Sequence, residues 1–246
     1  MKIDDIITYH ELVAEEQINL QKGMNFGVGK NYSILLMSVR EGAPYDDAFD
    51  ESGNLVYEGH DVPRSAGGPD PKLTDQPIQT PGGSWTENGK FYQSAVNYRS
   101  GLKERPELVK VYEKIQRGVW CYKGVFELVD ARIAQSGGRK VFKFHLHPVV
   151  KTVLKGLRDL PHNRLIPTKV KVEVWQRDHG RCVICGSDKN LHFDHVIPIS
   201  KGGSSLTAEN IQLLCAKHNL AKSDQILSLA PWLTAGLSAS HRIISN

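Results

Sequence analysis

The sequence predicts an α+β protein of two domains, a mainly β N-terminal domain followed by a smaller C-terminal domain. At 246 residues the chain is long enough for two modest domains that each bury a core. Runs of β-branched and aromatic residues recur between residues 31 and 144, whereas three of the four cysteines gather after residue 180. We therefore expect domains at residues 1–160 and 168–246, joined by a proline-containing linker.

The N-terminal domain is predicted from short β-rich runs that turns separate. Residues 31–39 and 54–57 are predicted as strands around an acidic turn, and residues 62–89 form a surface loop rich in proline and glycine. Apolar residues at helical spacing after Pro106 predict an amphipathic helix over residues 105–118. The remaining expected strands cover residues 119–122, 125–129 and 140–144.

The C-terminal domain is predicted to begin with a short helix. Thr168 can cap its N-terminus, and Gly180 follows its end. Alternating apolar residues predict a strand over residues 191–198, and a second strand is expected over residues 210–214. A further helix opens at Asn219. The order of these elements is strand, strand, helix.

Charge is distributed unevenly along the chain. Residues 163–246 hold ten Lys and Arg against six Asp and Glu, and this excess of four equals the whole net charge of +4. The excess indicates a polyanionic partner, although a charge of this size is also typical of a solvated surface. The best apolar run, residues 34–37, is much shorter than a membrane helix, and the first residues lack the pattern of a secretory signal. We expect a cytoplasmic protein without a membrane partner.

Two pairs of potential metal ligands lie in the C-terminal domain. Cys182 and Cys185 have the spacing at which two thiolates bind one tetrahedral zinc ion, and Cys215 with His218 supplies a second pair. In a reducing compartment, such clustering favours metal binding over disulfides. The pattern predicts a structural Zn²⁺ site with three Cys and one His ligands; the alternative is a set of scattered buried cysteines.

Residues 168–224 resemble the zinc-containing subgroup of the HNH endonuclease family, which has a ββα-metal core. The matching residues are Arg181-Cys182, Cys185-Gly186, Asp194-His195, Pro198, Ser200, Gly202-Gly203, Asn210, Leu214-Cys215, Asn219 and Lys222. In this subgroup a cysteine usually stands where this chain has His218. His218 is therefore expected to bind zinc; alternatively, it binds the catalytic ion and leaves zinc with three cysteines.

Phosphodiester hydrolysis requires an activated water, a cation to neutralise charge and support for the leaving oxygen. His195 titrates near neutral pH and can take a proton from water. The HNH resemblance implies that Asp194 and Asn219 ligate one divalent ion and that Asn210 orients His195 or its loop. Carboxylate and amide oxygens suit Mg²⁺ or Mn²⁺. Lys222, three residues after Asn219, is expected to contact phosphate.

Residues 30–150 resemble the SRA (YDG) domain family, whose members flip a modified cytosine out of DNA into a pocket. Tyr45 and Tyr57 lie on either side of an acidic segment, and residues 122–124, Tyr-Lys-Gly, stand where the family has Tyr-Asp-Gly. The resemblance implies a β barrel in which Tyr45 and Tyr57 sandwich the flipped base and restore its stacking. The alternative is that both tyrosines simply pack in a β core.

The cytosine amino group needs an acceptor. The family places an aspartate three residues after the first aromatic, and this chain has Ala48 there. Asp47, one residue earlier, is the expected acceptor.

Together these features predict a modification-dependent restriction endonuclease. Its partner is expected to be double-stranded DNA that contains 5-methylcytosine or 5-hydroxymethylcytosine. One Asp194–His195 site cuts one strand, so a double-strand break implies a homodimer. Three alternatives stay open: an HNH nuclease that reads unmodified sequence, a zinc-dependent DNA-binding protein without activity, and a protein directed at RNA.

Overall fold

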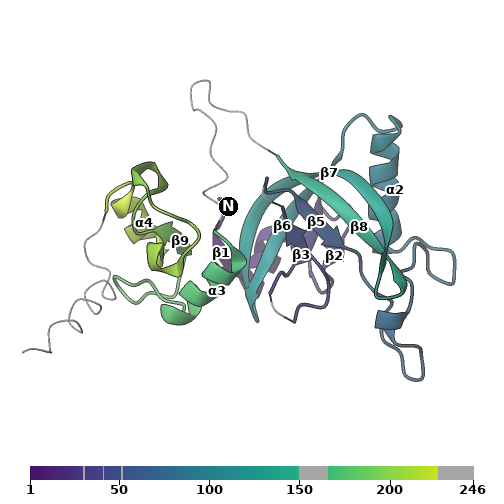
Figure 1. Cartoon of the computed structure of the whole chain (residues 1–246), viewed down its shortest axis with the longest axis horizontal. Coiled ribbons are helices and arrows are strands. Elements are labelled where there is room, and N and C mark those ends of the chain that lie inside the picture. The colour runs from purple at the N-terminus through teal and green to yellow at the C-terminus, as the bar shows by residue number, and fades with distance from the viewer. Residues whose placement is uncertain (30, 41, 51, 150–165, 227–246) are drawn as a thin grey trace, which may run out of the picture. The chain divides into compact units, whose positions relative to one another are not determined.

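The computed structural model describes residues 1–29, 31–40, 42–50, 52–149 and 166–226. The chain divides into two compact units, Met1–His162 and Asn163–Asn246, which Figure 1 draws from purple to teal and from green to yellow. Most of the predicted linker at residues 160–167 lies outside the described residues.

The described part of the N-terminal unit is built on one mixed sheet with two α-helices. Its strands follow the order β2-β3-β6-β7-β8-β5-β4, and β1 pairs with β7. β3 and β6 run parallel, whereas the other pairs are antiparallel. The elements are β1 (Ile6–Thr8), α1 (Tyr9–Glu16), β2 (Met24–Asn25), β3 (Ser33–Met37), β4 (Ala48–Phe49), β5 (Leu55–Glu58), α2 (Glu87–Arg99), β6 (Glu107–Gln116), β7 (Val119–Ser136) and β8 (Arg139–Pro148).

β7 joins the two halves of this sheet. It is 18 residues long, and its first part pairs with β6 while its last part pairs with β8. The two strands predicted at residues 119–122 and 125–129 are therefore parts of one strand. The chain passes between them at Gly124, whose φ of +101° is accessible mainly to glycine. A register shift between Leu128 and Asp130 bends the strand further.

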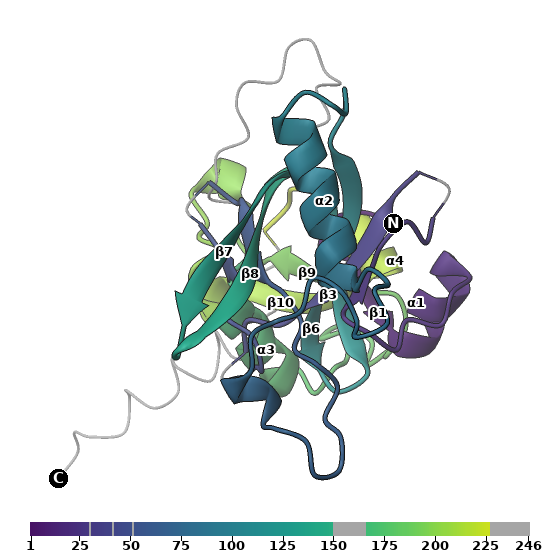
Figure 2. The ribbon, with the colours of Figure 1, turned by 90° about the vertical axis from the view of Figure 1, so that its right-hand side faces the viewer.

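The main core lies between the sheet and α2. Phe91 and Ala95, four residues apart on α2, are fully buried against side chains of the strands. α2 packs on β7 and β8 (Figure 2). The other buried members of this core are Met24, Leu35, Met37, Leu55, Tyr57, Val109, Val111, Phe126, Leu128, Ala131, Phe142, Phe144 and Leu146.

The helix predicted over residues 105–118 is wrong, because this segment forms strand β6. Val109, Val111 and Ile115 fit an alternating pattern as well as a helical one, and all three are buried. β-Branched residues favour the strand, and β6 gains hydrogen-bonded neighbours on both sides, β3 and β7. The sequence fits a helical and an alternating pattern equally well. Pairing with a strand at each edge therefore selects the strand.

The first residues of α2 fall within the predicted surface loop, residues 62–89. Thr86 caps the helix, since its hydroxyl accepts a hydrogen bond from the N–H of Gly89. Trp85 packs on Gly89, where a Cβ would lie 2.7 Å from the indole ring. The glycine that indicated a loop instead allows the preceding segment to lie close to the helix.

The C-terminal unit has the predicted ββα core. α3 (Thr168–Arg177) precedes the antiparallel strands β9 (Leu191–His195) and β10 (Ile211–Cys215), and α4 (Ala216–Lys222) follows directly. Pro167, not Thr168, occupies the N-cap position of α3. The predicted α+β class is thereby confirmed. Of the described helices, none is long and apolar enough to cross a membrane.

Candidate active site and metal centre

Four potential metal ligands converge in the C-terminal unit. The ligand atoms of Cys182, Cys185, Cys215 and His218 all lie within 4.8 Å of one another. Nδ1 of His218 lies 3.4 Å from Sγ of Cys182 and 3.3 Å from Sγ of Cys215. The sulfurs of Cys185 and Cys215 are 3.9 Å apart. A tetrahedral zinc ion with ordinary bond lengths places its ligand atoms about 3.5–3.8 Å apart, so this set fits such an ion.

Local structure explains why these four residues meet. Cys182 and Cys185 lie in the loop after α3, where the N–H of Gly186 bonds to the carbonyl of Cys182. Cys215 ends β10, and His218 lies in the first turn of α4. The two short pairs thus come from a tight turn and from the strand–helix junction.

The environment favours the thiolate form of Cys182. Burial raises the pKa of this thiol, but hydrogen bonds from the backbone N–H groups of Cys215, Cys185 and Ile184 lower it more. Its pKa is therefore lowered to about 6. Thiolates are the form of cysteine that binds metals.

Asp194 and His195 are the last two residues of β9. Oδ2 of Asp194 accepts a hydrogen bond from Nε2 of Gln212, its cross-strand neighbour, at 3.3 Å. Oδ1 of Asp194 has no hydrogen-bond partner among the residues that the structure describes. One carboxylate oxygen thus stays available for a cation, which supports the predicted role of Asp194 as a ligand.

The ring of His195 contacts a buried hydroxyl group. Its Nε2 lies 2.8 Å from Oγ of Ser205, which is 1 % exposed. A hydrogen bond of this length fixes the orientation of an imidazole ring and influences which nitrogen carries the proton. Ser205 was not among the predicted site residues, because it lies ten positions from His195 with no motif around it.

Asn210 holds the loop that follows His195. Its side-chain carbonyl accepts the N–H of Ile197 at 2.8 Å, and its amide group donates to the carbonyls of Ile197 and Ser204 at 3.0 and 2.8 Å. Gly203 is packed tightly here, since a Cβ would lie 1.8 Å from the carbonyl oxygen of Ile197. Asn210 therefore contacts the loop, and the structure brings it to the place that the prediction of a loop-orienting role requires.

Lys222 is placed differently from its predicted position at the DNA backbone. Its side chain is 1 % exposed, and its Nζ lies 2.9 Å from Oδ2 of Asp194 and 2.7 Å from the carbonyl oxygen of His195. This placement disagrees with a phosphate contact, because the ammonium group is enclosed by protein. Asn219 lies half-buried on the same helix, and since residues three apart share a helix face, it lies on the side of α4 that carries Lys222.

The predicted base-binding residues do not enclose an open slot. Tyr57 is 1 % exposed and belongs to the main core, and its hydroxyl lies 2.8 Å from Nε2 of His60. Tyr45 stacks on the same imidazole, with ring centres 4.7 Å apart and an interplanar angle of 9°. Burial lowers the pKa of His60 to about 4, so the ring is neutral at neutral pH. The imidazole of His60 thus contacts both predicted stacking residues.

Asp47 is buried between two strands. Its two carboxylate oxygens accept the backbone N–H groups of Glu58 and Ser38 at 3.0 and 3.2 Å. Burial raises the pKa of this carboxyl group to about 7. Both oxygens therefore already bind the backbone, and Ala48, the family's position for the acid, is exposed.

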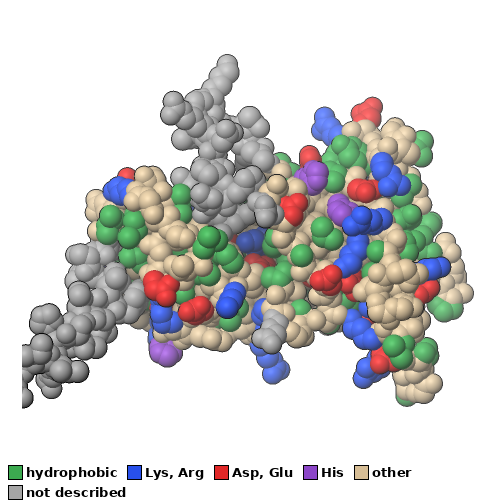
Figure 3. Space-filling view, in the orientation of Figure 1, with side chains coloured by type: hydrophobic (Ala, Val, Ile, Leu, Met, Phe, Trp, Pro, Cys, Tyr) green, Lys and Arg blue, Asp and Glu red, His purple; other side chains and the backbone are tan. Residues whose placement is uncertain are grey.

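A partly buried ion network lies beside Tyr45. Arg139, which is 5 % exposed, pairs with Asp61 at 2.5 Å and with Glu58 at 3.4 Å. Lys72 pairs with Asp61 at 2.8 Å and places its Nζ 4.3 Å from the centre of the Tyr45 ring. Acidic and basic side chains of this unit are interspersed on the face that Figure 3 shows, in agreement with its balanced charge.

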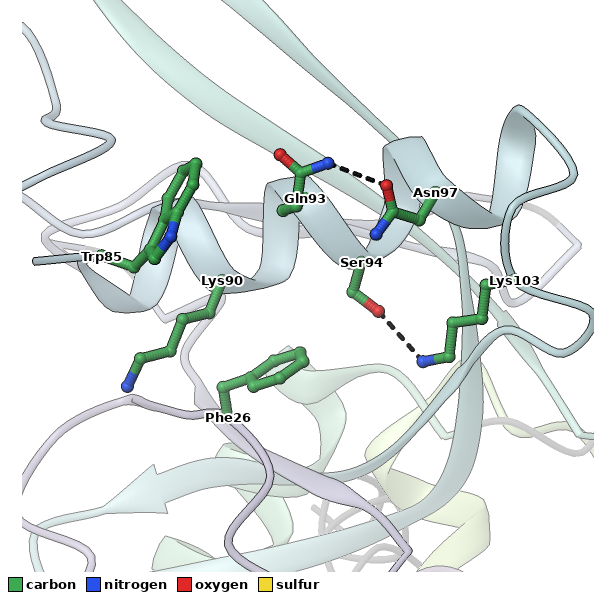
Figure 4. Close-up of a pocket in the computed structure, with 7 residues that line it drawn as sticks. All are labelled: Phe26, Trp85, Lys90, Gln93, Ser94, Asn97 and Lys103. Atoms are coloured by element: carbon green, nitrogen blue, oxygen red, sulfur yellow. Dashed lines mark hydrogen bonds between the residues drawn. The ribbon is translucent and has the colours of Figure 1, made fainter.

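Two of the pockets in the described part of the chain lie in the N-terminal unit, and neither of these two includes Tyr45, Tyr57 or Asp47. The first has a volume of about 320 Å³ and runs along α2, where Lys103 donates to Ser94 (Figure 4). Its lining residues are Phe26, Trp85, Lys90, Gln93, Ser94, Asn97 and Lys103. The second, of about 400 Å³, lies between α1 and the turn from β6 to β7.

Comparison with known proteins places the C-terminal site in a family. Residues 182–225 match the HNH endonuclease family, and this segment contains the four clustered ligands together with Asp194 and His195. No curated protein matches the chain.

Several solved structures are similar to the chain. The SRA domain of SUVH5 in complex with hemimethylated CG DNA is 21 % identical over 65 % of this chain and 94 % of that chain, with a TM-score of 0.42. The DNA modification-dependent restriction endonuclease AspBHI is 16 % identical over 58 % of this chain and 73 % of that chain, with a TM-score of 0.42. The modification-dependent TagI restriction endonuclease is 16 % identical over 89 % and 76 %, with a TM-score of 0.38. From the family match, the C-terminal unit of this protein carries an HNH endonuclease domain, and the chain is a nuclease of the hydrolase class.

Proposed function

We propose that this protein is a restriction endonuclease that cleaves double-stranded DNA containing 5-methylcytosine or 5-hydroxymethylcytosine. The N-terminal domain, proposed at residues 1–160, would recognise the modified base, and the HNH domain, within residues 168–246, would hydrolyse the phosphodiester bond. The observation that carries the nuclease part is the Asp194–His195 pair at the end of β9, inside the matched HNH segment that also contains the four-ligand cluster.

His195 is the general base of the proposed reaction. A neutral imidazole nitrogen accepts the proton of the attacking water, and the hydroxyl of Ser205 holds the ring in place. Asn210 keeps the loop after His195 in one conformation through its three hydrogen bonds. Asp194 and Asn219 would hold Mg²⁺ or Mn²⁺, which when bound neutralises the charge that develops on the phosphate and the leaving oxygen.

The cluster of Cys182, Cys185, Cys215 and His218 would hold a structural Zn²⁺. With this ion bound, the ligand set would be closed, since three thiolates and one imidazole would fill the four positions of a tetrahedral site. This ion is thus assigned to folding, and catalysis to the site at Asp194.

The base-recognition part rests on the SRA resemblance at Tyr45 and Tyr57. Tyr45 is half-buried and its ring already contacts His60 and Lys72. A flipped cytosine would take the place of one of these neighbours and stack on the Tyr45 ring, with Tyr57 below it and Asp47 near its amino group. This proposal requires Tyr45 or its neighbours to move when DNA binds.

Replacement of Tyr45 by alanine should weaken binding to modified DNA about 10-fold or more, because base–aromatic stacking contributes about 1–3 kcal/mol per base. Binding of unmodified DNA should not change. Fluorescence anisotropy with matched methylated and unmethylated duplexes measures both affinities. Tyr98→Ala, a half-buried tyrosine of α2, is the control and should leave both unaltered. Equal loss for both duplexes would argue against a base contact at Tyr45.

We also infer that two copies act together. Each chain has one Asp194–His195 pair, which cuts one strand, so a double-strand break needs a second copy in opposite orientation. Sedimentation analysis with and without DNA would detect the homodimer. A protein that stays monomeric on DNA and only nicks it would exclude this arrangement.

A further inference from the structure

We propose that Lys222 is a positioning residue for cleavage, which sets the geometry of Asp194 and His195 together. This inference rests on the proposed nuclease function of those two residues. It replaces the predicted phosphate contact with a role inside the protein.

The first argument is burial. The side chain of Lys222 is 1 % exposed, and lysine is almost never fully buried unless it is paired. Its ammonium group makes a charge-assisted contact of 2.9 Å with Oδ2 of Asp194 and a hydrogen bond of 2.7 Å to the carbonyl of His195. A partner of this kind is required for a buried charge, and here the partners are the two consecutive residues of the active site.

The second argument is where these contacts act. Lys222 is the last residue of α4, and Asp194 and His195 are the last residues of β9. The ammonium group therefore ties the end of the helix to the end of the strand. Because one bond goes to the backbone of His195, Lys222 influences the position of the His195 ring through the main chain.

The third argument is which oxygen of Asp194 is used. Lys222 and Gln212 both contact Oδ2, so the carboxylate cannot rotate freely. Oδ1 is then the oxygen that remains for a divalent ion. Lys222 thus leaves Oδ1 as the oxygen for the cation and holds the carboxylate group in one orientation.

The two roles for Lys222 predict different kinetics. A lysine that contacts phosphate contributes to DNA affinity, and its loss reduces the salt dependence of binding by about one counterion. A positioning lysine leaves affinity and salt dependence unchanged, and its loss lowers the rate of the bound complex. A misplacement of about 1 Å at an active site can lower the rate about 10²-fold.

The test compares Lys222→Met with wild type in the zinc-loaded full chain, on a DNA duplex that wild type cleaves with Mg²⁺ or Mn²⁺. We expect kcat to fall about 100-fold, with KM for DNA and the salt dependence of binding unchanged. Lys217→Met is the matched control on the same helix, where Lys217 is exposed, and it should cleave like wild type. Zinc content and thermal unfolding check that each variant is folded.

Lys222→Gln keeps a hydrogen-bond donor without the charge. If the methionine variant does not fold, the same measurements of kcat, KM and salt dependence on the glutamine variant distinguish the two roles. An intermediate kcat with unchanged KM supports the positioning role. Unchanged kcat in a folded Lys222 variant, or weaker DNA binding with a smaller salt dependence, would overturn it while the nuclease function stands. A wild-type protein that cleaves no DNA with any divalent ion would overturn both.

Discussion

Replacing His195 by alanine should lower the rate of DNA cleavage by about 10²–10⁴-fold, the usual contribution of a general base. The variant loses the nitrogen that accepts the proton from water, while every described ligand of the four-residue metal cluster stays in place. Folding, zinc content and DNA affinity should therefore equal those of wild type. Single-turnover cleavage with Mg²⁺ or Mn²⁺ measures the rate.

His192→Ala provides the matched control for this experiment. His192 lies on the same strand, three residues before His195, and pairs in register with Leu214 on β10. It has no assigned role in the reaction, so its replacement should keep most of the activity. A His195→Ala protein that cuts as fast as wild type would favour the alternative in which the zinc-containing unit only binds nucleic acid.

Removing the metal from the Cys182–Cys185–Cys215–His218 cluster should unfold the C-terminal unit. A structural zinc site contributes about 10–16 kcal/mol of apparent binding free energy, which in a small unit is folding free energy. The N-terminal unit has a large core of its own and should stay folded. Hydrogen exchange of the full chain, before and after treatment with a chelator, would locate the loss of protection after residue 166.

Cys182→Ser should have the same effect as the chelator, because it removes one of the four clustered ligands, a thiol that is 2 % exposed. Cys121→Ser is the control, since Cys121 is buried in β7 of the N-terminal unit and is not one of the four clustered ligands. It should leave the zinc content at one ion per chain. Protection that persists in the C-terminal unit without metal would contradict a structural role for the ion.

The C-terminal unit could be predicted from sequence because its signals are local. Two ligand pairs, each with two residues between the ligands, lie within the 44 matched residues together with a glycine turn and two short β-rich runs. Each of these patterns determines the local structure of its own segment. The strand–strand–helix order and the convergence of the four ligands follow from these short-range patterns.

The contacts that complete the site could not be predicted in this way. Ser205, Gln212 and Lys222 reach Asp194 or His195 from three different elements, and none carries a signal of its own. In the sequence, a lysine near an active site suggests a side chain that is exposed to solvent and contacts phosphate. The burial of this lysine depends instead on how α4 packs on β9. Burial of this kind is decided by tertiary structure.

Parts of the N-terminal fold also depend on tertiary contacts that could not be predicted from the sequence. Residues 107–116 satisfy helical and alternating patterns equally, and the pairing with β3 and β7 selects the strand. At Tyr45 and Tyr57, the SRA resemblance implied two stacking rings. It could not indicate that His60 contacts both of them, or that both oxygens of Asp47 bind the backbone.

The most direct test of the whole account is cleavage of one plasmid in three forms: unmodified, carrying 5-methylcytosine and carrying 5-hydroxymethylcytosine. The full chain is incubated with each form and Mg²⁺ or Mn²⁺, beside His195→Ala. The account predicts cutting of modified plasmid only, and none in the His195 variant. Equal cutting of all three forms would contradict base recognition by the N-terminal unit, and cutting that persists in the variant would contradict the assigned active site.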